Sequence, residues 1–113
     1  MSKYQLMTRD QEDLVEMVHA FMRKEVDPYV AEYDEKGICP IDTVRKLMDL
    51  GFWGIDVPEE YGGAGLSYLS YIAVCEELAV HCATTSVVLS AHESLCSWPI
   101  YKYGTEEQKQ KYL

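Results

Sequence analysis

Helix start signals at both ends of this chain constrain its fold more than any other feature. Thr8 and Gln11 have the spacing of a capping box, and Thr105 and Gln108 repeat that spacing near the last residue. Apolar residues recur at helical spacing behind the first of these caps. The sequence therefore predicts an all-α domain, a helical bundle of about five to six helices.

Turn-forming residues set the expected ends of the helices in the first half. A helix is expected over about 8–24, followed by a bent segment that Asp27 caps and Gly37 ends. A compact third helix ends at Gly51. The stretch 52–67 holds a proline and three glycines without helical periodicity, so it is predicted to be an ordered loop.

Two longer helices are expected in the second half. The first spans about 67–82 and, because much of its circumference is apolar, should lie centrally. The second begins at Thr84 or Thr85, is kinked by Pro99 and ends at Gly104. The final capped segment stops after about two turns, below the length that is stable alone, so the natural polypeptide is expected to continue.

The charge of the chain argues against two classes of partner. Its 19 acidic and 10 basic residues give a net charge of −9, which repels nucleic acid and anionic lipid headgroups. No apolar run approaches the roughly 20 residues of a membrane span. The first eleven residues lack the features of a secretory or organellar leader, so a cytoplasmic protein is expected.

The spacing of metal-binding and titratable residues favours no site. His19, His81 and His92 lie far apart and none has a helical partner of the His or Cys type at i+4, so no metal site is expected. Glu76 and Glu77 are adjacent, and a solvated or ion-paired role is favoured over acid–base catalysis. The widely spaced cysteines are expected to be reduced core thiols: Cys39, Cys75, Cys82 and Cys96.

A glycine cluster and an apolar stripe each have a structural and a functional interpretation. Gly62, Gly63 and Gly65 match neither phosphate-binding loop pattern, which favours a structural turn over a ligand-contacting loop. The helix near residue 90 carries a continuous stripe at helical spacing, formed by Val88, Ala91, His92 and Leu95. Core packing and the lining of an apolar ligand channel both remain open for this stripe.

Four sequence blocks, in order across nearly the whole chain, carry a resemblance to a known family. The chain resembles the N-terminal helical domain of acyl-CoA dehydrogenases over 1–113, most closely the short-chain, butyryl-type bacterial members. The blocks are Gly51–Ile55 with Pro58–Leu66, Cys75–Ala79, Ser90–His92 with Ser94–Leu95 and Trp98–Ile100, and Gly104–Lys109.

The resemblance implies a three-domain oxidoreductase whose middle β-domain and C-terminal helical domain lie outside this chain. Such an enzyme oxidises short-chain acyl-CoA to 2-enoyl-CoA: a glutamate removes the α-proton while FAD accepts the β-hydride. The likeness further implies a homo-oligomer, a homotetramer, that passes electrons to an electron-transfer flavoprotein in fatty acid β-oxidation.

The resemblance places part of the acyl pocket on this chain. It implies that Val88, Ala91, His92 and Leu95 bind the acyl chain, whereas no catalytic, FAD-binding or metal-binding residue is carried over. The chain alone is therefore expected to bind no FAD and to be inactive. Two other interpretations stay open: a stand-alone helical interaction module, and the same domain of an acyl-CoA oxidase-like relative.

Overall fold

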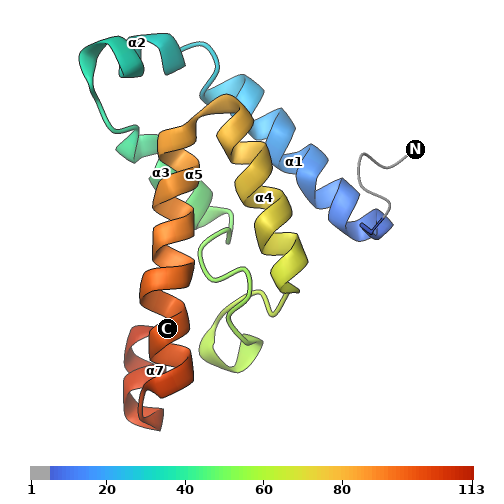
Figure 1. The fold of residues 1–113 in the computed structure, drawn as a ribbon, viewed down its shortest axis with the longest axis vertical. Coiled ribbons are helices and arrows are strands. Elements are labelled where there is room, and N and C mark those ends of the chain that lie inside the picture. The colour runs from blue at the N-terminus through green and yellow to red at the C-terminus, as the bar shows by residue number, and fades with distance from the viewer. Residues whose placement is uncertain (1–5) are drawn as a thin grey trace.

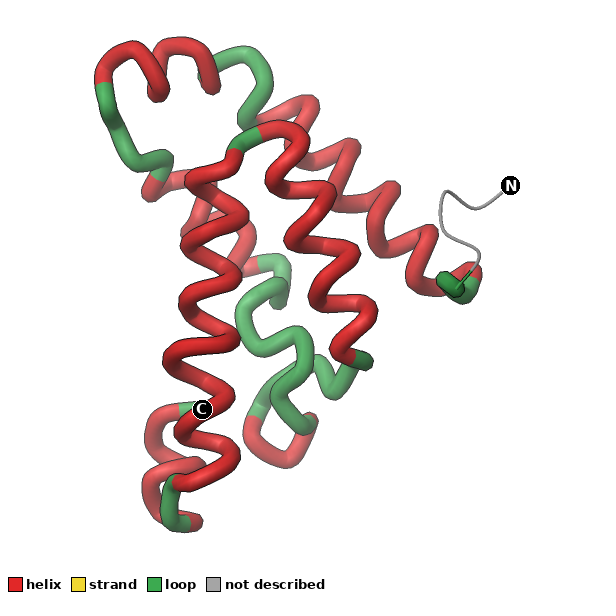
Figure 2. The backbone as a smooth tube through the Cα atoms, viewed as in Figure 1, coloured by secondary structure: helices red, strands yellow, loops and turns green. Residues whose placement is uncertain are grey.

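The chain folds into helices joined by short turns and one long loop. A computed structural model describes residues 6–113, which contain helices and no β-strand, as the sequence predicts (Figures 1 and 2). The helices are α1 (Arg9–Glu25), α2 (Val30–Lys36), α3 (Ile41–Asp49), the 3₁₀ turn η1 (Glu59–Tyr61), α4 (Tyr68–His81), α5 (Ala83–Ala91), the π-helical η2 (His92–Ser97), α6 (Trp98–Tyr103) and α7 (Glu106–Tyr112).

The capping signals act as predicted. Thr8 and Gln11 form a reciprocal capping box at the start of α1, and Thr105 and Gln108 do the same for α7. The Ser67 side chain accepts a hydrogen bond from the Ser70 N–H at the start of α4. These bonds satisfy backbone donors that have no partner within the helix, and so they fix where each helix begins.

The predicted role of Asp27 as a helix cap is wrong. The residue before α2 is Tyr29, which makes no side-chain capping bond, although Gly37 ends the helix in a left-handed conformation (φ 62°) as expected. The Asp27 carboxylate instead contacts Nδ1 of His81 at 2.6 Å. Asp27 lies two residues before the N-cap position Tyr29, and its carboxylate is directed to an imidazole on α4 instead of to the start of α2.

Helix α4 occupies the centre of the bundle. It lies between α1 and α5, and a single residue, Cys82, joins it to α5 (Figure 1). Its Val74 and Leu78 are fully buried against Val18 and Met22 of α1. The described residues form a slab of 42 × 37 × 19 Å, so the outer helices have one buried face and one face that no other part of residues 6–113 covers.

Three helical segments form one continuous rod from Ala83 to Tyr103. The rod begins one residue before the predicted Thr84, and its capping residue Cys82 makes no side-chain bond. The predicted kink at Pro99 takes the form of a widened turn before it, in which the Trp98 N–H donates to the Glu93 carbonyl five residues earlier. Because proline has no N–H and crowds the carbonyl four residues before it, the wider turn gives its ring room.

The loop between α3 and α4 is ordered, as predicted, and packs on itself. A Cβ atom at Gly63 would lie 2.0 Å from the Val57 carbonyl oxygen, so only glycine fits at this close approach. Gly65 has a φ of 62°, in the left-handed region. The glycine cluster therefore has a structural role.

The prediction that all four cysteines are core thiols is only half correct. All four are free, but Cys39 and Cys96 are exposed, while Cys82 is buried and Cys75 is half-buried. Burial raises the pKa of the Cys75 thiol to about 11, which keeps it protonated and unreactive at neutral pH. Cysteine spacing does not report burial: Cys39 lies in the turn between α2 and α3, and Cys96 lies on the exposed side of η2.

Candidate functional site

The stripe of Val88, Ala91, His92 and Leu95 lies on the rod formed by α5 and η2. The first three side chains are half-buried, and Leu95 is 73% exposed. A leucine at the surface of a helix that is otherwise packed against the core leaves apolar area in water. The structure therefore places the end of this stripe at the surface, where another part of a larger molecule could cover it.

Further apolar side chains surround a hollow of about 560 Å³ beside this rod. Tyr68 at the start of α4 is 64% exposed and Trp98 at the start of α6 is 50% exposed. Both line the hollow, together with Asp56, Leu66, Tyr71, Glu93 and Ser94. The sequence identified the stripe but not this hollow, because its lining comes from three separate segments.

His92 packs against the loop between α3 and α4. Its ring centroid lies 6.0 Å from that of Trp53. Burial lowers the pKa of His92 below its ordinary value of 6.5, so the ring is neutral at pH 7. A neutral ring tilted against the Trp53 ring is compatible with an apolar surface, and it carries no charge into the stripe.

Glu93 is the buried acid of this region, and sequence reasoning missed it. Its side chain is 1% exposed, and Oε1 accepts a hydrogen bond from the Gly54 N–H of the long loop. The neighbouring Asp56 carboxyl interacts with the Glu93 carboxyl by side-chain hydrogen bonding and by its like charge. Burial first, and then Asp56, raise the pKa of Glu93 to about 7.

The position of Glu93 explains how the loop is attached to the rod. The contact joins residues 39 positions apart, at the widened turn that Pro99 requires. A buried carboxyl that accepts a backbone N–H positions the loop beneath His92, and so supports the exposed stripe from inside. The signal available in the sequence was an acidic residue within an apolar helix, which by itself does not identify a partner.

The glycine-rich turn does not offer a phosphate-binding loop. Its backbone N–H groups donate within the loop: Gly63 to the Pro58 carbonyl, Gly65 to the Val57 carbonyl and Leu66 to the Ile55 carbonyl. A phosphate-binding loop needs such N–H groups free to face the ligand. This turn therefore does not fit the pyrophosphate of a dinucleotide.

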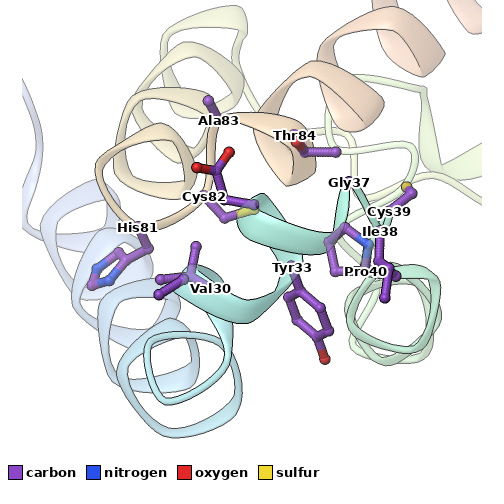
Figure 3. A pocket seen from close by; sticks show the side chains of 12 residues that line it. Val30, Tyr33, Gly37, Ile38, Cys39, Pro40, His81, Cys82, Ala83 and Thr84 are labelled. Carbon is purple, nitrogen blue, oxygen red and sulfur yellow. The ribbon is translucent and has the colours of Figure 1, made fainter.

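A second hollow, of about 540 Å³, lies between α2, the turn that follows it and the α4–α5 junction (Figure 3). Figure 3 shows Ile38, Cys39 and Pro40 at one end of it and His81 at the other, with Cys82, Ala83 and Thr84 along one side. None of the stripe residues lines this hollow, so it is separate from the candidate acyl surface.

The structure also brings together two histidines that are 62 positions apart. Nε2 of His81 lies 3.2 Å from Nδ1 of His19, and Glu77 contacts both rings. Glu77 therefore contacts two imidazole rings rather than facing solvent alone. The spacing of histidines along one helix does not reveal this cluster, because its members lie on two helices, α1 and α4.

The arrangement defines an all-helical domain whose outermost rod presents an apolar surface. No helix within residues 6–113 is long and apolar enough to cross a membrane. Residues 8–113 match the family described as "Acyl-CoA dehydrogenase, N-terminal domain". The chain belongs to the acyl-CoA dehydrogenase family, as its N-terminal helical domain.

Individual relatives agree with this assignment. Over 107 residues the chain is 51% identical to the short-chain specific acyl-CoA dehydrogenase of Clostridium acetobutylicum, and over 100 residues it is 42% identical to the human mitochondrial short-chain enzyme. Those matches cover 95% and 88% of this chain. They cover only 28% and 24% of the two relatives, so the chain spans about a quarter of their length.

Solved structures give the same result. The butyryl-CoA dehydrogenase of Megasphaera elsdenii superposes with a TM-score of 0.89 at 40% identity, over 100% of this chain and 30% of that one. A chain from a study of the electron transferring flavoprotein of Acidaminococcus fermentans superposes with a TM-score of 0.91 at 46% identity, over 100% of this chain and 29% of that one. The predicted fold and family are confirmed.

Proposed function

We propose that this chain forms one side of the acyl pocket of a flavin-dependent short-chain acyl-CoA dehydrogenase whose other domains complete the site. The observation that carries the proposal is the exposed apolar end of the stripe, with Leu95 73% exposed on the rod of a family domain. The named relatives are short-chain and butyryl-CoA dehydrogenases, which supports a short acyl thioester as the substrate.

The proposed contribution of the stripe is to exclude water and to limit acyl length. Val88, Ala91 and Leu95 offer only carbon to a ligand, and His92 is neutral at pH 7. Such a surface stabilises an apolar acyl chain by removing it from water, and it strengthens electrostatic interactions at a nearby thioester. The base that removes the α-proton is proposed to lie in another domain, because the stripe holds no carboxylate.

The cofactor and partners are part of the same proposal. The glycine turn does not fit a dinucleotide, so FAD is proposed to be held by other domains and not by this chain alone. Electron transfer to an electron-transfer flavoprotein is supported by the subject of one of the solved structures. A cytoplasmic homotetramer acting in β-oxidation follows from the family resemblance.

Flavin binding and acyl-CoA oxidation test this proposal. The purified chain is expected to stay colourless after incubation with FAD and gel filtration, and to leave butyryl-CoA unchanged. A polypeptide that joins it to the remaining domains is expected to be yellow and to be bleached by butyryl-CoA without oxygen. Retention of flavin by the chain alone, or a joined polypeptide that butyryl-CoA does not reduce, contradicts the proposal.

A further inference from the structure

We propose that His19, Glu77 and His81 form a Zn²⁺ site that joins α1 to α4, with Asp27 positioning His81. The inference stands on a different face from the acyl stripe and is independent of the proposed function. His19 comes from α1, while Glu77 and His81 lie one turn apart on α4. Three ligands of this kind with an open fourth position are the set found at many zinc centres.

The separations between the ligand atoms match a tetrahedral ion. A Zn²⁺ with bonds of about 2.0–2.1 Å to nitrogen and oxygen separates its ligand atoms by about 3.3 Å. Nε2 of His81 lies 3.2 Å from Nδ1 of His19 and 3.2 Å from Oε1 of Glu77. The third separation, between Nδ1 of His19 and Oε1 of Glu77, is 2.6 Å and needs to widen by less than 1 Å.

The hydrogen bond to Asp27 leaves the inner nitrogen of His81 free to bind a cation. Oδ1 of Asp27 lies 2.6 Å from Nδ1 of His81, and a carboxylate at this distance favours the tautomer protonated at Nδ1. The lone pair of Nε2 then faces the Glu77 carboxylate. Nε2 thus lies where the ligand atoms of His19, Glu77 and His81 converge, all within 4.8 Å of one another.

Asp27 also supplies the carboxylate that holds the outer nitrogen of His81, as carboxylates do for histidines in many zinc sites. Zinc-bound histidine usually donates its other N–H to a carboxylate, which fixes the orientation of the ring. The His81 side chain is 6% exposed and that of Glu77 is 13% exposed, so both are held by the surrounding helices. His19 is 48% exposed, which lets it adjust and leaves room for a water molecule as fourth ligand.

Zinc is the ion that this set of donors favours. Two imidazoles and one carboxylate suit Zn²⁺, whereas Mg²⁺ and Ca²⁺ prefer sets made only of oxygen. The site joins the first helix to the central one, beyond the apolar contacts at Val18 and Leu78. Bound zinc is therefore expected to stabilise the α1–α4 pair, because it binds the folded chain and not the unfolded one.

Zinc titration of the chain by calorimetry tests the site. Exposed thiols are potential zinc ligands, so the parent protein for this titration carries Cys39→Ser and Cys96→Ser. We expect saturable binding of one ion per chain and a Tm that rises with zinc. Co²⁺ in place of Zn²⁺ is expected to give the visible absorption of a four-coordinate site.

Variants separate a zinc site from a network of hydrogen bonds. His19→Gln changes an exposed side chain, so the fold is retained while zinc affinity falls. Asp27→Asn is expected to weaken zinc binding about 10–100-fold, as is typical when a group that hydrogen-bonds to a metal-bound histidine is replaced. His92→Gln is the matched control, because it removes a histidine outside the cluster and leaves zinc affinity unchanged.

Two results overturn the proposal. One is the absence of saturable zinc binding by the parent protein, with a Tm that zinc does not change. The other is binding that His19→Gln and Glu77→Gln leave as tight as in the parent, which assigns the ion to other residues. Circular dichroism of each metal-free variant verifies that loss of binding does not reflect unfolding.

Discussion

The inner face of α4 and the outer face of the α5–η2 rod contain similar apolar side chains in opposite surroundings. Leu78 on α4 is fully buried against α1, whereas Leu95 on the rod is 73% exposed. Both residues follow a helical apolar pattern. The comparison teaches that such a pattern identifies a face that avoids water, and that the rest of the molecule decides whether this chain covers it.

The two faces also differ in their polar groups. Beside the inner face, His19, Glu77, His81 and Asp27 form a connected network. Beneath the outer face, the buried Glu93 carboxyl accepts the Gly54 N–H of the long loop and lies beside the Asp56 carboxyl. The first network links two helices, α1 and α4, whereas the second links the rod to the loop between α3 and α4.

Replacing one leucine on each face by alanine is expected to give the largest difference in the free energy of unfolding between the two faces. Leu78→Ala leaves a cavity in a packed core and is expected to lower the free energy of unfolding by about 4 kcal/mol. Leu95→Ala removes a side chain already in water and is expected to change it by less than about 0.5 kcal/mol. Urea unfolding of both variants measures the difference, and equal losses would show that the stripe is part of the core.

The fold could be predicted largely from local signals. Three predictions were correct because each depends on a few adjacent residues. They are the capping boxes, the cap of α4 at Ser67 and the end of α2 at Gly37. The role of Asp27 was not predictable, since its partner, His81, is 54 positions away. The π-helical turn depends on Pro99 together with the loop that Glu93 holds, and periodicity contains no such information.

The pH dependence of stability tests the buried acid beneath the outer face. Its ordinary pKa is 4.5, and in the folded chain it is about 7, so between these values only the folded state holds the proton on Glu93. The contribution of protonated Glu93 to the free energy of unfolding is therefore fully present below pH 4.5 and is lost as pH rises through 7. Over this pH range the free energy of unfolding of the wild-type chain is expected to fall by about 3 kcal/mol relative to that of Glu93→Gln.

Glu93→Gln keeps the oxygen that accepts the Gly54 N–H and removes the ionisation. Unfolding by urea at a series of pH values from 5 to 8 compares the two proteins, and their difference cancels the other titrating groups. A difference that does not change with pH would mean that Glu93 ionises in the folded chain as it does in water. An exposed acid, Asp42→Asn, serves as the control.

The candidate site could be predicted only in part. Helical spacing gave the stripe of Val88, Ala91, His92 and Leu95, and its role in acyl binding stays a prediction. The hollow beside it and the histidine cluster were missed because their members come from segments brought together by packing. Sequence spacing along one helix does not report contacts between helices.

The acyl preference of a Leu95→Ala variant tests the central claim most directly. In a polypeptide that joins this chain to the proposed remaining domains and binds FAD, the smaller side chain is expected to deepen the pocket. The ratio of kcat/KM for hexanoyl-CoA to that for butyryl-CoA is then expected to rise about tenfold. Val87→Ala, a similarly exposed position (65%) outside the stripe, is expected to leave the ratio unchanged. An unchanged ratio in Leu95→Ala would contradict the claim that this face lines the acyl pocket.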